Sequence, residues 1–455
     1  MLIENAHISD IVGNRIDVQF RIGIDKILNS IKRVHCIPLG EIAHFSADSW
    51  DQKSLFKDVF PYIEISSIDT TTGCINDIDM VPINEAPSRA KKIVKKDDIL
   101  ISTTRPNRGA ICLYKNDYIS IASTGFSIIR EVNDNILRDY LFEVLRLPIS
   151  LKQMMIRSSG GNYPAIIESE LKKILIPVPS IEIQKEVVRY LWHIKRERTN
   201  KRQEVRRLIE GIDDYILKKL DISLKIGNQG SSYYHINYSE LIGGRLDVGY
   251  YNHSKHGCIM EALKSPQYPS LPLSSLAKDI FQGVGKNETD DDTYVLLKVK
   301  NILPGNRIDY SDVEYVKSVP KNKILIDNDI ISPFIGEAVR QIKFSIFNKA
   351  ESNYTVDNNT GVIRLKETIN AQYVCEYLCS CLGKRQIERL IGGGGVPFLG
   401  SSGAKKLIIV VPPIEIQNEI AKTITSIRSN ADVLINEGDA LLEEAKQKVE
   451  KMIIG

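Results

Sequence analysis

The segment LKKILIPVPSIEIQKEV at Leu171–Val187 recurs as AKKLIIVVPPIEIQNEI at Ala404–Ile420, about 233 residues later. The four residues IEIQ are identical in the two copies. Each copy places two lysines before a short β-branched run, then prolines, then a charged stretch with apolar residues at helical spacing. This order predicts a strand that ends at prolines and leads directly into a helix.

Four further blocks fall into register at nearly the same offset and in the same order. They are RIDVQF (15–20) with RLDVGY (245–250), IPLGEIA (37–43) with LPLSSLA (271–277), DDILIS (97–102) with NDIISP (328–333), and STGFSII (123–129) with NTGVIRL (359–365). Five ordered matches indicate an internal duplication.

Each half reads as some 160 residues of short strand-like runs followed by one long charged segment. We therefore expect an α+β fold with two pseudo-symmetric domains separated by two long helices. The expected boundaries are 1–179 for the first domain, 180–222 for the first helix, 223–240 for a connector, 241–412 for the second domain and 413–455 for the second helix. In each domain a helix, at 139–156 and 372–390, should precede a glycine-rich loop, at 158–164 and 392–398.

The long segments carry heptad-spaced apolar residues, and at ~1.5 Å per residue each helix would be on the order of 55 Å long. We expect the two helices of one chain to pair antiparallel as a coiled-coil-like bar, with large residues of one facing Ala431, Gly438 and Ala445 of the other. Pairing between two molecules is the alternative. Arg198 and Lys201 place charge at the centre of the seam. The predicted packing residues are Val187, Leu191, Ile194, Val205, Leu208, Ile212, Ile420, Ile424, Ile427, Leu434 and Leu441.

Composition excludes some classes of protein. The 455 residues contain 60 Lys and Arg against 57 Asp and Glu, a net charge of +3, so any basic binding surface must be local. Seven cysteines and an N-terminus without signal-peptide features predict reduced thiols inside a cell. The apolar runs, such as LIIVV at 407–411, are far shorter than the ~18 to 20 residues of a membrane span.

The duplicated IEIQ segments, the opening RIDVQF and RLDVGYY, and DDILISTTRPNRGAI (97–111) resemble the specificity subunits of Type I restriction-modification systems over essentially the whole chain. The resemblance implies two target-recognition domains, each reading one half of an asymmetric bipartite target in double-stranded DNA. It further implies a non-catalytic cytoplasmic subunit of a prokaryotic phage-defence system that carries two methylase subunits and, for cleavage, restriction subunits. No cofactor is expected on this chain, since S-adenosylmethionine would bind the methylases.

Base edges and phosphates are contacted best by Arg, Lys, Asn, Gln, hydroxyl groups and exposed backbone amides, so loops that cluster these are the candidate DNA contacts. For the first domain we predict Arg105, Asn107, Arg108, Ser158, Ser159, Asn162, Tyr163, Lys172 and Lys173. For the second domain we predict Lys298, Lys300, Asn301, Arg340, Gln341, Gly393, Gly394, Gly395, Lys405 and Lys406.

Two other functions stay open at this point: a self-sufficient DNA-modifying enzyme and a protein–protein adaptor. DIFQGVG (279–285) matches the S-adenosylmethionine loop of adenine methylases, but the Asn/Asp-Pro-Pro-aromatic motif that holds a flipped adenine is missing. A phosphate-binding G-x-x-x-x-G-K-[ST] loop is absent too. The thiols Cys375, Cys379 and Cys381 lack zinc-ligand spacing, and the acidic run at 288–292 favours a solvated loop, so neither catalytic residues nor a metal site is predicted.

Overall fold

The computed structural model describes residues 23, 31, 34–224, 258–264, 267–285, 294–349, 353–391 and 395–454. The blocks at 15–20 and 245–250, most of the connector at 223–240, the acidic run at 288–292, and Gly393 and Gly394 lie outside these residues. The chain forms two compact units: unit 1 comprises Met1–Arg202 with Ile435–Gly455, and unit 2 comprises Gln203–Leu434. Each unit thus contains part of both long helices.

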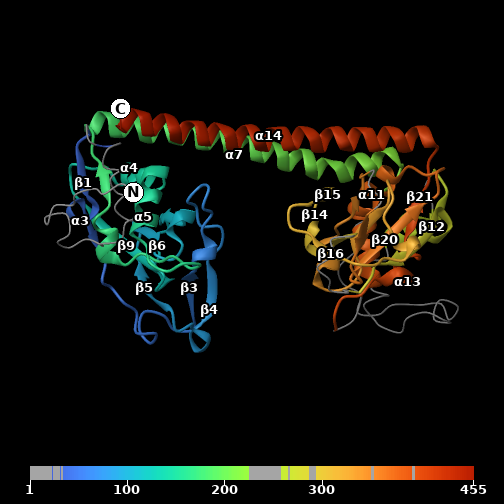
Figure 1. Ribbon diagram of the computed structural model, residues 1–455, viewed down its shortest axis with the longest axis horizontal. Coiled ribbons are helices and arrows are strands. Elements are labelled where there is room, and N and C mark those ends of the chain that lie inside the picture. The colour runs from blue at the N-terminus through green and yellow to red at the C-terminus, as the bar shows by residue number, and fades with distance from the viewer. Residues whose placement is uncertain are drawn as a thin grey trace. The chain divides into compact units, whose positions relative to one another are not determined.

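Unit 1 contains two four-stranded sheets and a separate strand pair (Figure 1). The first sheet has the order β2 (Ala43–Phe45), β9 (Phe126–Val132), β6 (Ile99–Ser102) and β7 (Ile111–Leu113), and the second has β4 (Asp79–Pro82), β3 (Val59–Ile63), β8 (Ser120–Ser123) and β5 (Ala90–Val94). β1 (Cys36–Pro38) pairs antiparallel with β10 (Leu175–Pro177), which is the predicted strand before the first long helix. The short helices are α3 (Leu39–Ile42), α4 (Arg138–Leu145), α5 (Pro148–Arg157) and α6 (Glu168–Leu171).

Unit 2 repeats the first sheet and the strand pair. Its sheet has the order β12 (Ala277–Gln282), β20 (Thr360–Leu365), β17 (Ile330–Pro333) and β18 (Ser345–Ile346), and β11 (Ser270–Pro272) pairs with β21 (Ile408–Val410). A second sheet contains β16 (Glu314–Val316), β13 (Tyr294–Leu297) and β19 (Tyr354–Val356), beside the pair β14 (Ile302–Leu303) and β15 (Arg307–Ile308). The helices are α9 (Cys258–Ala262), α10 (Leu273–Leu276), α11 (Ala371–Cys379), α12 (Cys381–Leu390) and α13 (Gly400–Ala404).

The helix expected before each glycine-rich loop is in fact two helices. In unit 1 the break lies at Leu147, because the residue before a proline is driven out of the helical region and Pro148 begins α5. In unit 2 the break lies at Ser380, which is extended and whose hydroxyl accepts a hydrogen bond from the backbone of Leu382. Helical periodicity alone does not reveal such a break.

The long helices are α7 (Ile181–Lys219) and α14 (Ile414–Ile454). Within unit 1, Arg198 pairs with Asp439 and Lys201 with Glu437, both at 2.7 Å, so the two helices run antiparallel. Within unit 2 the same sense follows from the hydrogen bond between Tyr215 and Thr423 and the ion pair of Lys219 with Glu419. The α+β class and the antiparallel helix pair are therefore confirmed, and the charged centre of the seam is satisfied by acidic residues of the partner helix.

The burial of the predicted packing residues varies along the pair. Val187, Leu191, Ile194, Ile212, Ile420 and Ile424 are buried, whereas Val205, Leu208, Ile427, Leu434 and Leu441 are half-buried. In the last turns of α14, Ala445 is buried as the heptad assignment predicted, whereas the other buried residues, Leu442, Val449 and Ile453, lie one position away from it. The seam shifts there because this end of α14 also packs on α4 and α5 of unit 1. The Glu450 carboxylate accepts a hydrogen bond from the Ile149 amide.

The main core of each unit joins the first sheet, the short helices and the long helices. In unit 1 this core includes Ile101, Leu141, Leu191 and Leu442. In unit 2 the corresponding core includes Ile330, Ile216 and Ile424. None of the helices in the described part of the chain is long and apolar enough to cross a membrane.

Candidate DNA interface

The two loops of unit 1 that were predicted separately lie side by side. They are the arginine loop (103–109, TTRPNRG) and the first glycine loop (158–165). The amide of Arg105 donates to the carbonyl of Pro164 at 2.7 Å, and the amide of Ile166 donates to the carbonyl of Thr103 at 2.9 Å. We call the two loops together tip 1.

Arg105 and Tyr163 meet at tip 1. The guanidinium carbon of Arg105 lies 4.3 Å from the centre of the Tyr163 ring, which is 70% exposed. Arg105 has a left-handed backbone (φ 48°), and the following 3-10 turn, η3 (Pro106–Arg108), exposes Asn107 and Arg108. Three predicted contact residues of one loop are thus presented together with an aromatic ring from the other.

The polar residues of the first glycine loop divide into two groups. Ser158 is buried, and its hydroxyl donates to the Met154 carbonyl at the end of α5, so it belongs to the framework of the loop. Ser159 and Asn162 are exposed, and the backbone of Ser159 forms two reciprocal hydrogen bonds of 2.8 Å with Ala165.

Unit 2 builds a second tip from the equivalent segments. Its loops are 334–342, which contains the 3-10 turn η7 (Glu337–Gln341), and 395–400. The amide of Gly336 donates to the carbonyl of Pro397 at 2.9 Å, and Ile335 forms a β-bridge with Phe398, as Thr104 does with Ala165 in unit 1. We call this pair of loops tip 2.

The side chains of tip 2 differ in character from those of tip 1. Arg340 and Gln341 are exposed in the first loop of tip 2, and Arg340 pairs with Glu337 at 3.3 Å. Gly395 is exposed in the second loop. Val396 and Phe398 are 72% and 52% exposed. Sequence reasoning missed these two, although the apolar VPF directly after a glycine run was visible, because apolar residues were not considered as DNA contacts.

Three predicted contacts of unit 2 lie in another segment. Lys300 and Asn301 belong to the turn η5 (Val299–Asn301) between β13 and β14, and Lys298 directly precedes this turn, whereas tip 2 follows β17. Asn301 is buried, and its amide donates to the carbonyls of Asp309 and Asp312 while its oxygen accepts the Lys298 amide. The Asn301 side chain therefore holds this turn together and does not face outward. Lys298 and Lys300 form ion pairs with Glu314 and Asp312.

The repeated lysine pairs precede β10 and β21. Lys172 pairs with Glu168 at 2.9 Å and lies over the Phe45 ring, and Lys173 pairs with Glu170 at 2.7 Å. Lys405 and Lys406 follow α13 and are exposed, in a stretch where the sequence GSSGA has no acidic residue. The same two positions thus carry different local charge in the two units.

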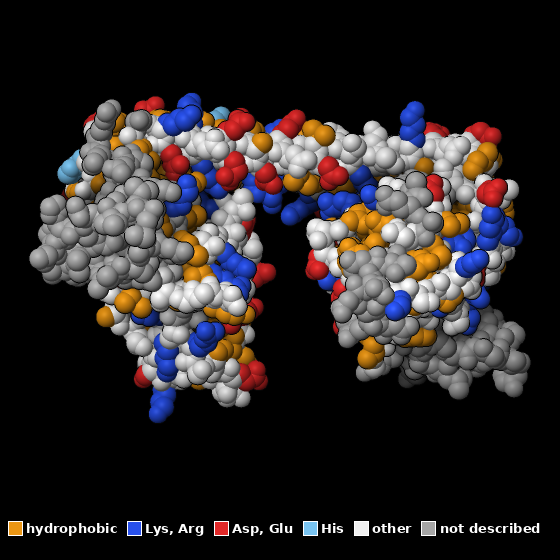
Figure 2. Space-filling view, viewed as in Figure 1, with side chains coloured by type: hydrophobic (Ala, Val, Ile, Leu, Met, Phe, Trp, Pro, Cys, Tyr) orange, Lys and Arg blue, Asp and Glu red, His pale blue; other side chains and the backbone are white. Residues whose placement is uncertain are grey.

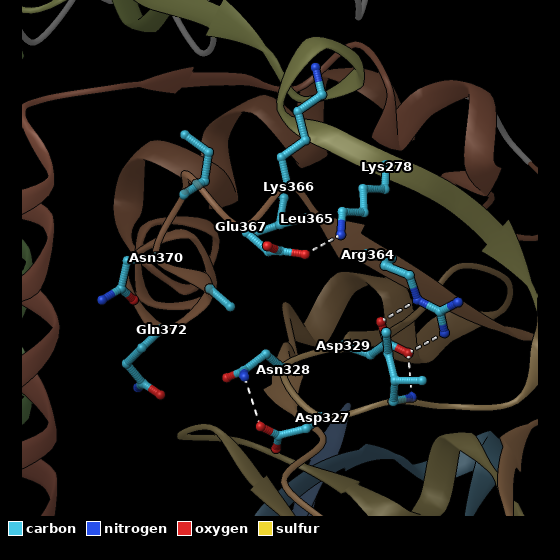
Figure 3. Close-up of a pocket in the computed structure, with 13 residues that line it drawn as sticks. Lys278, Asp327, Asn328, Asp329, Arg364, Leu365, Lys366, Glu367, Asn370 and Gln372 are labelled. Carbon is cyan, nitrogen blue, oxygen red and sulfur yellow. Dashed lines mark hydrogen bonds and ion pairs between the residues drawn. The ribbon is translucent and has the colours of Figure 1, made fainter. Parts of the chain in front are cut away.

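A polar pocket of about 530 Å³ lies in unit 2 beside the first turn of α11 (Figure 3). Its charges are bound within the protein: Lys278 pairs with Glu367, and Arg364 pairs with Asp329. Burial raises the pKa of Asp329, and Arg364 opposes that rise. In unit 1 an arginine occupies the corresponding place, where Arg138 donates to the carbonyl of Asp97, while unit 2 has Ala371. Unit 2 thus has the shorter side chain of Ala371 at the wall of this pocket.

Gly283, the first glycine of the methylase-like string DIFQGVG (279–285), has a structural role. A Cβ atom at Gly283 would lie 1.9 Å from the carbonyl oxygen of Val356, so only glycine fits where the chain directly after β12 approaches the end of β19. Cys375 is buried in α11, which raises the pKa of its thiol, and Cys379 donates to the Phe344 carbonyl. No group of three or more potential metal ligands is present in the described ranges of the chain.

Comparison with known proteins gives consistent results. The family model described as "Type I restriction modification DNA specificity domain" matches residues 33–207 and 280–444. The chain is 28% identical over 109 residues to the HindI specificity subunit of Haemophilus influenzae, a match that spans 23% of this chain and 24% of that subunit. It is 21% identical to the Type I restriction enzyme MjaVIII specificity subunit of Methanocaldococcus jannaschii, over 80% of this chain and 79% of that one. A chain in a solved structure of a type I R-M system aligns over 92% of this chain and 96% of its own length, with a TM-score of 0.51 and 18% identity.

Proposed function

Because the chain belongs to the Type I restriction-modification DNA specificity domain family, we propose that it is the specificity subunit of such a system and binds double-stranded DNA in a sequence-specific way. The observation that carries the proposal is the pair of tips. In both tips, the loop that follows a central strand forms backbone hydrogen bonds with the loop that follows the helix pair. The two tips nevertheless present different side chains. Two similar domains with different contact residues suit an asymmetric target of two parts.

We further propose that this chain selects the DNA while partner subunits perform the chemistry. Two methylase subunits would carry S-adenosylmethionine, and restriction subunits would join for cleavage. The long helices suit docking of the partners, since α7 and α14 expose Trp192, Ile209 and Val433 among charged residues. In the view of Figure 2, positively and negatively charged side chains are scattered along these helices.

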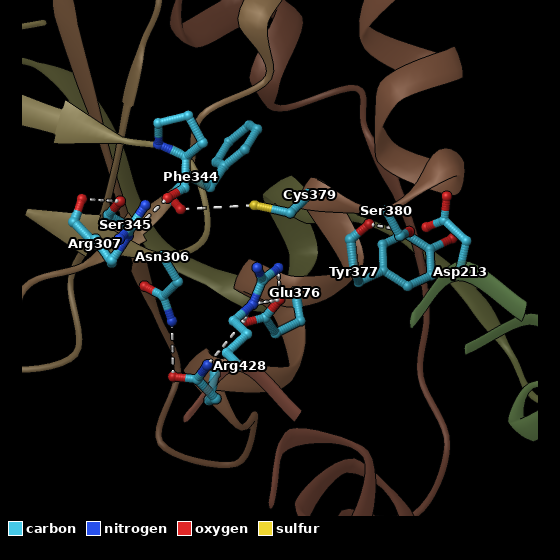
Figure 4. A network of polar contacts seen from close by, with 12 residues as sticks. Asp213, Asn306, Arg307, Phe344, Ser345, Glu376, Tyr377, Cys379, Ser380 and Arg428 are labelled. Carbon is cyan, nitrogen blue, oxygen red and sulfur yellow. Dashed lines mark hydrogen bonds and ion pairs between the residues drawn. The ribbon is translucent and has the colours of Figure 1, made fainter. Parts of the chain in front are cut away.

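The recognition domains are tied to the long helices by ion pairs that are largely shielded from solvent, which supports a rigid presentation of the tips. In unit 2, Arg428 of α14 binds Glu376 of α11, and Asp213 of α7 accepts the amide of Cys381 (Figure 4). In unit 1, Lys195 of α7 binds Glu143 of α4. A tip that reads base edges has to be held in place to within a fraction of an ångström.

The test is to map methylated bases in DNA from cells that express this chain with its methylase, against cells lacking only this chain. We expect an asymmetric, two-part adenine-methylation motif that disappears with the deletion. Exchanging residues 34–170 for those of another specificity subunit should change one half of the motif only. Methylation by the purified chain alone would favour a self-sufficient enzyme, and an active methylase whose motif ignores this chain would favour an adaptor.

A further inference from the structure

We infer that Arg105, stacked on Tyr163, reads a guanine in the half of the target that unit 1 binds. The inference rests on the proposed function and adds the base that one recognition domain selects. Three observations carry it: the backbone at Arg105, the stacked ring, and the surroundings of the guanidinium.

The backbone at position 105 is one that favours glycine. Arg105 has φ 48° and ψ 54°, in the left-handed helical region, and the residue in the same place of unit 2 is Gly336, which also has a positive φ (93°) but a different ψ (177°). Each follows the central strand of its sheet by three residues and donates its amide to the proline carbonyl of the glycine loop. A left-handed backbone is strained for arginine and free of strain for glycine. Unit 1 thus holds a bulky cation with a positive φ where unit 2 has glycine, and backbone strain of this kind clusters at functional sites.

Tyr163 fixes the plane of the guanidinium. The 4.3 Å stack joins an arginine from one loop to a ring from the other, and the ring is largely exposed to solvent. A guanidinium that lies flat on a ring keeps its N–H edges free and directed outward in one plane. Within the described ranges, none of the carboxylates forms an ion pair with Arg105, whereas Arg340 of tip 2 pairs with Glu337. Its donors are available to a ligand.

The geometry suits a base edge better than a phosphate. Guanine presents two acceptors, N7 and O6, side by side in the major groove, and the arginine fork matches both, whereas adenine and cytosine place an amino donor there. A phosphate can also accept the arginine fork, but Arg108, exposed on the same loop, can supply that contact and leave Arg105 for a base edge. A fixed plane and a strained backbone position indicate base recognition by Arg105.

The test uses Arg105→Gly in the chain assembled with its methylase subunits. Glycine adopts the left-handed backbone of position 105 without strain, so the unfolding temperature should stay close to that of the wild type, which separates recognition from misfolding. Methylation rates are measured on duplexes that carry each base in turn at every position of the half-site of unit 1. We expect the wild type to prefer guanine at one position by roughly 10- to 100-fold and the variant to lose that preference there alone.

Two further variants define the alternatives. Arg108→Ala should weaken binding to all duplexes alike, and Lys96→Ala, an exposed lysine paired with Asp117, should change neither preference nor rate. The inference is overturned if Arg105→Gly keeps the guanine preference, if it weakens all duplexes equally as a phosphate contact would, or if the half-site of unit 1 contains no guanine. If the wild type shows no motif that depends on this chain, the proposed function itself fails and the inference fails with it.

Discussion

Arg428 on α14 donates from Nε and Nη2 to the carboxylate of Glu376 on α11, which has no exposed surface (Figure 4). Lys195 and Glu143 occupy the same two positions 233 residues earlier, and they pair as well. The recognition domain of each unit is therefore fastened to a long helix at an equivalent point, but by α14 in unit 2 and by α7 in unit 1.

We predict that Glu376→Ala lowers the free energy of unfolding by about 3–5 kcal/mol, because it leaves Arg428 without its counter-charge in a buried place. Denaturant unfolding followed by circular dichroism measures the loss. Glu367→Ala is the matched control, since its pair with Lys278 is exposed and is expected to contribute little to stability. Equal effects of the two substitutions would show that the buried pair does not anchor the domain.

The glutamine of each IEIQ segment has the same structural role in both units. Gln417 is buried, accepts the amide of Asn370 and donates to the carbonyl of Pro412, and Gln184 makes the equivalent bonds to Leu137 and Pro179. Gln417→Ala should destabilise the protein by about 2–4 kcal/mol, because two backbone groups at the start of α11 and α14 lose their partners. Lys422→Ala, exposed on the same helix, should cost less than about 0.5 kcal/mol. A thermal melt of both variants decides, and a Gln417→Ala melt that matches Lys422→Ala would contradict this role.

The duplicated segment allowed the strand, the helix start and the long helices to be predicted, because proline and heptad spacing act locally. The contact of Arg105 with Tyr163 could not be predicted, since it depends on the sheet that carries the two loops to one place. Asn301 shows the opposite limit: asparagine in a loop fits a DNA contact and a turn equally well, and only its buried hydrogen bonds distinguish them. The buried position shifts from Leu441 to Leu442 because α14 also packs on the helices of unit 1, and helix periodicity carries no information about that contact.

Stability should fall in alkali through buried thiols such as Cys112 on β7. Burial raises the pKa of Cys112 from 9.0 to about 12, so between these values the unfolded chain loses a proton that the folded chain keeps. The contribution of this thiol to stability is thus complete below pH 9 and declines above it, by up to about 1.4 kcal/mol per pH unit. The difference in unfolding free energy between the wild type and Cys112→Ala should therefore shrink from pH 8 to pH 10. Curves that stay parallel would refute the assignment.

The lysine pairs should contribute unequally to DNA affinity. A lysine that already pairs with a glutamate neutralises a phosphate less effectively. Lys172 and Lys173 are paired in this way. The residues that directly precede Lys405 and Lys406, GSSGA, include no acidic residue. Replacing Lys405 and Lys406 by alanine should reduce the slope of log K against log salt by about 1–2 in the assembled complex, if both contact phosphates. Replacing Lys172 and Lys173 should reduce the slope by less. Titrations at several salt concentrations on the same duplex measure both slopes, and a larger change from the unit 1 pair would show that the glutamates release their lysines when DNA binds.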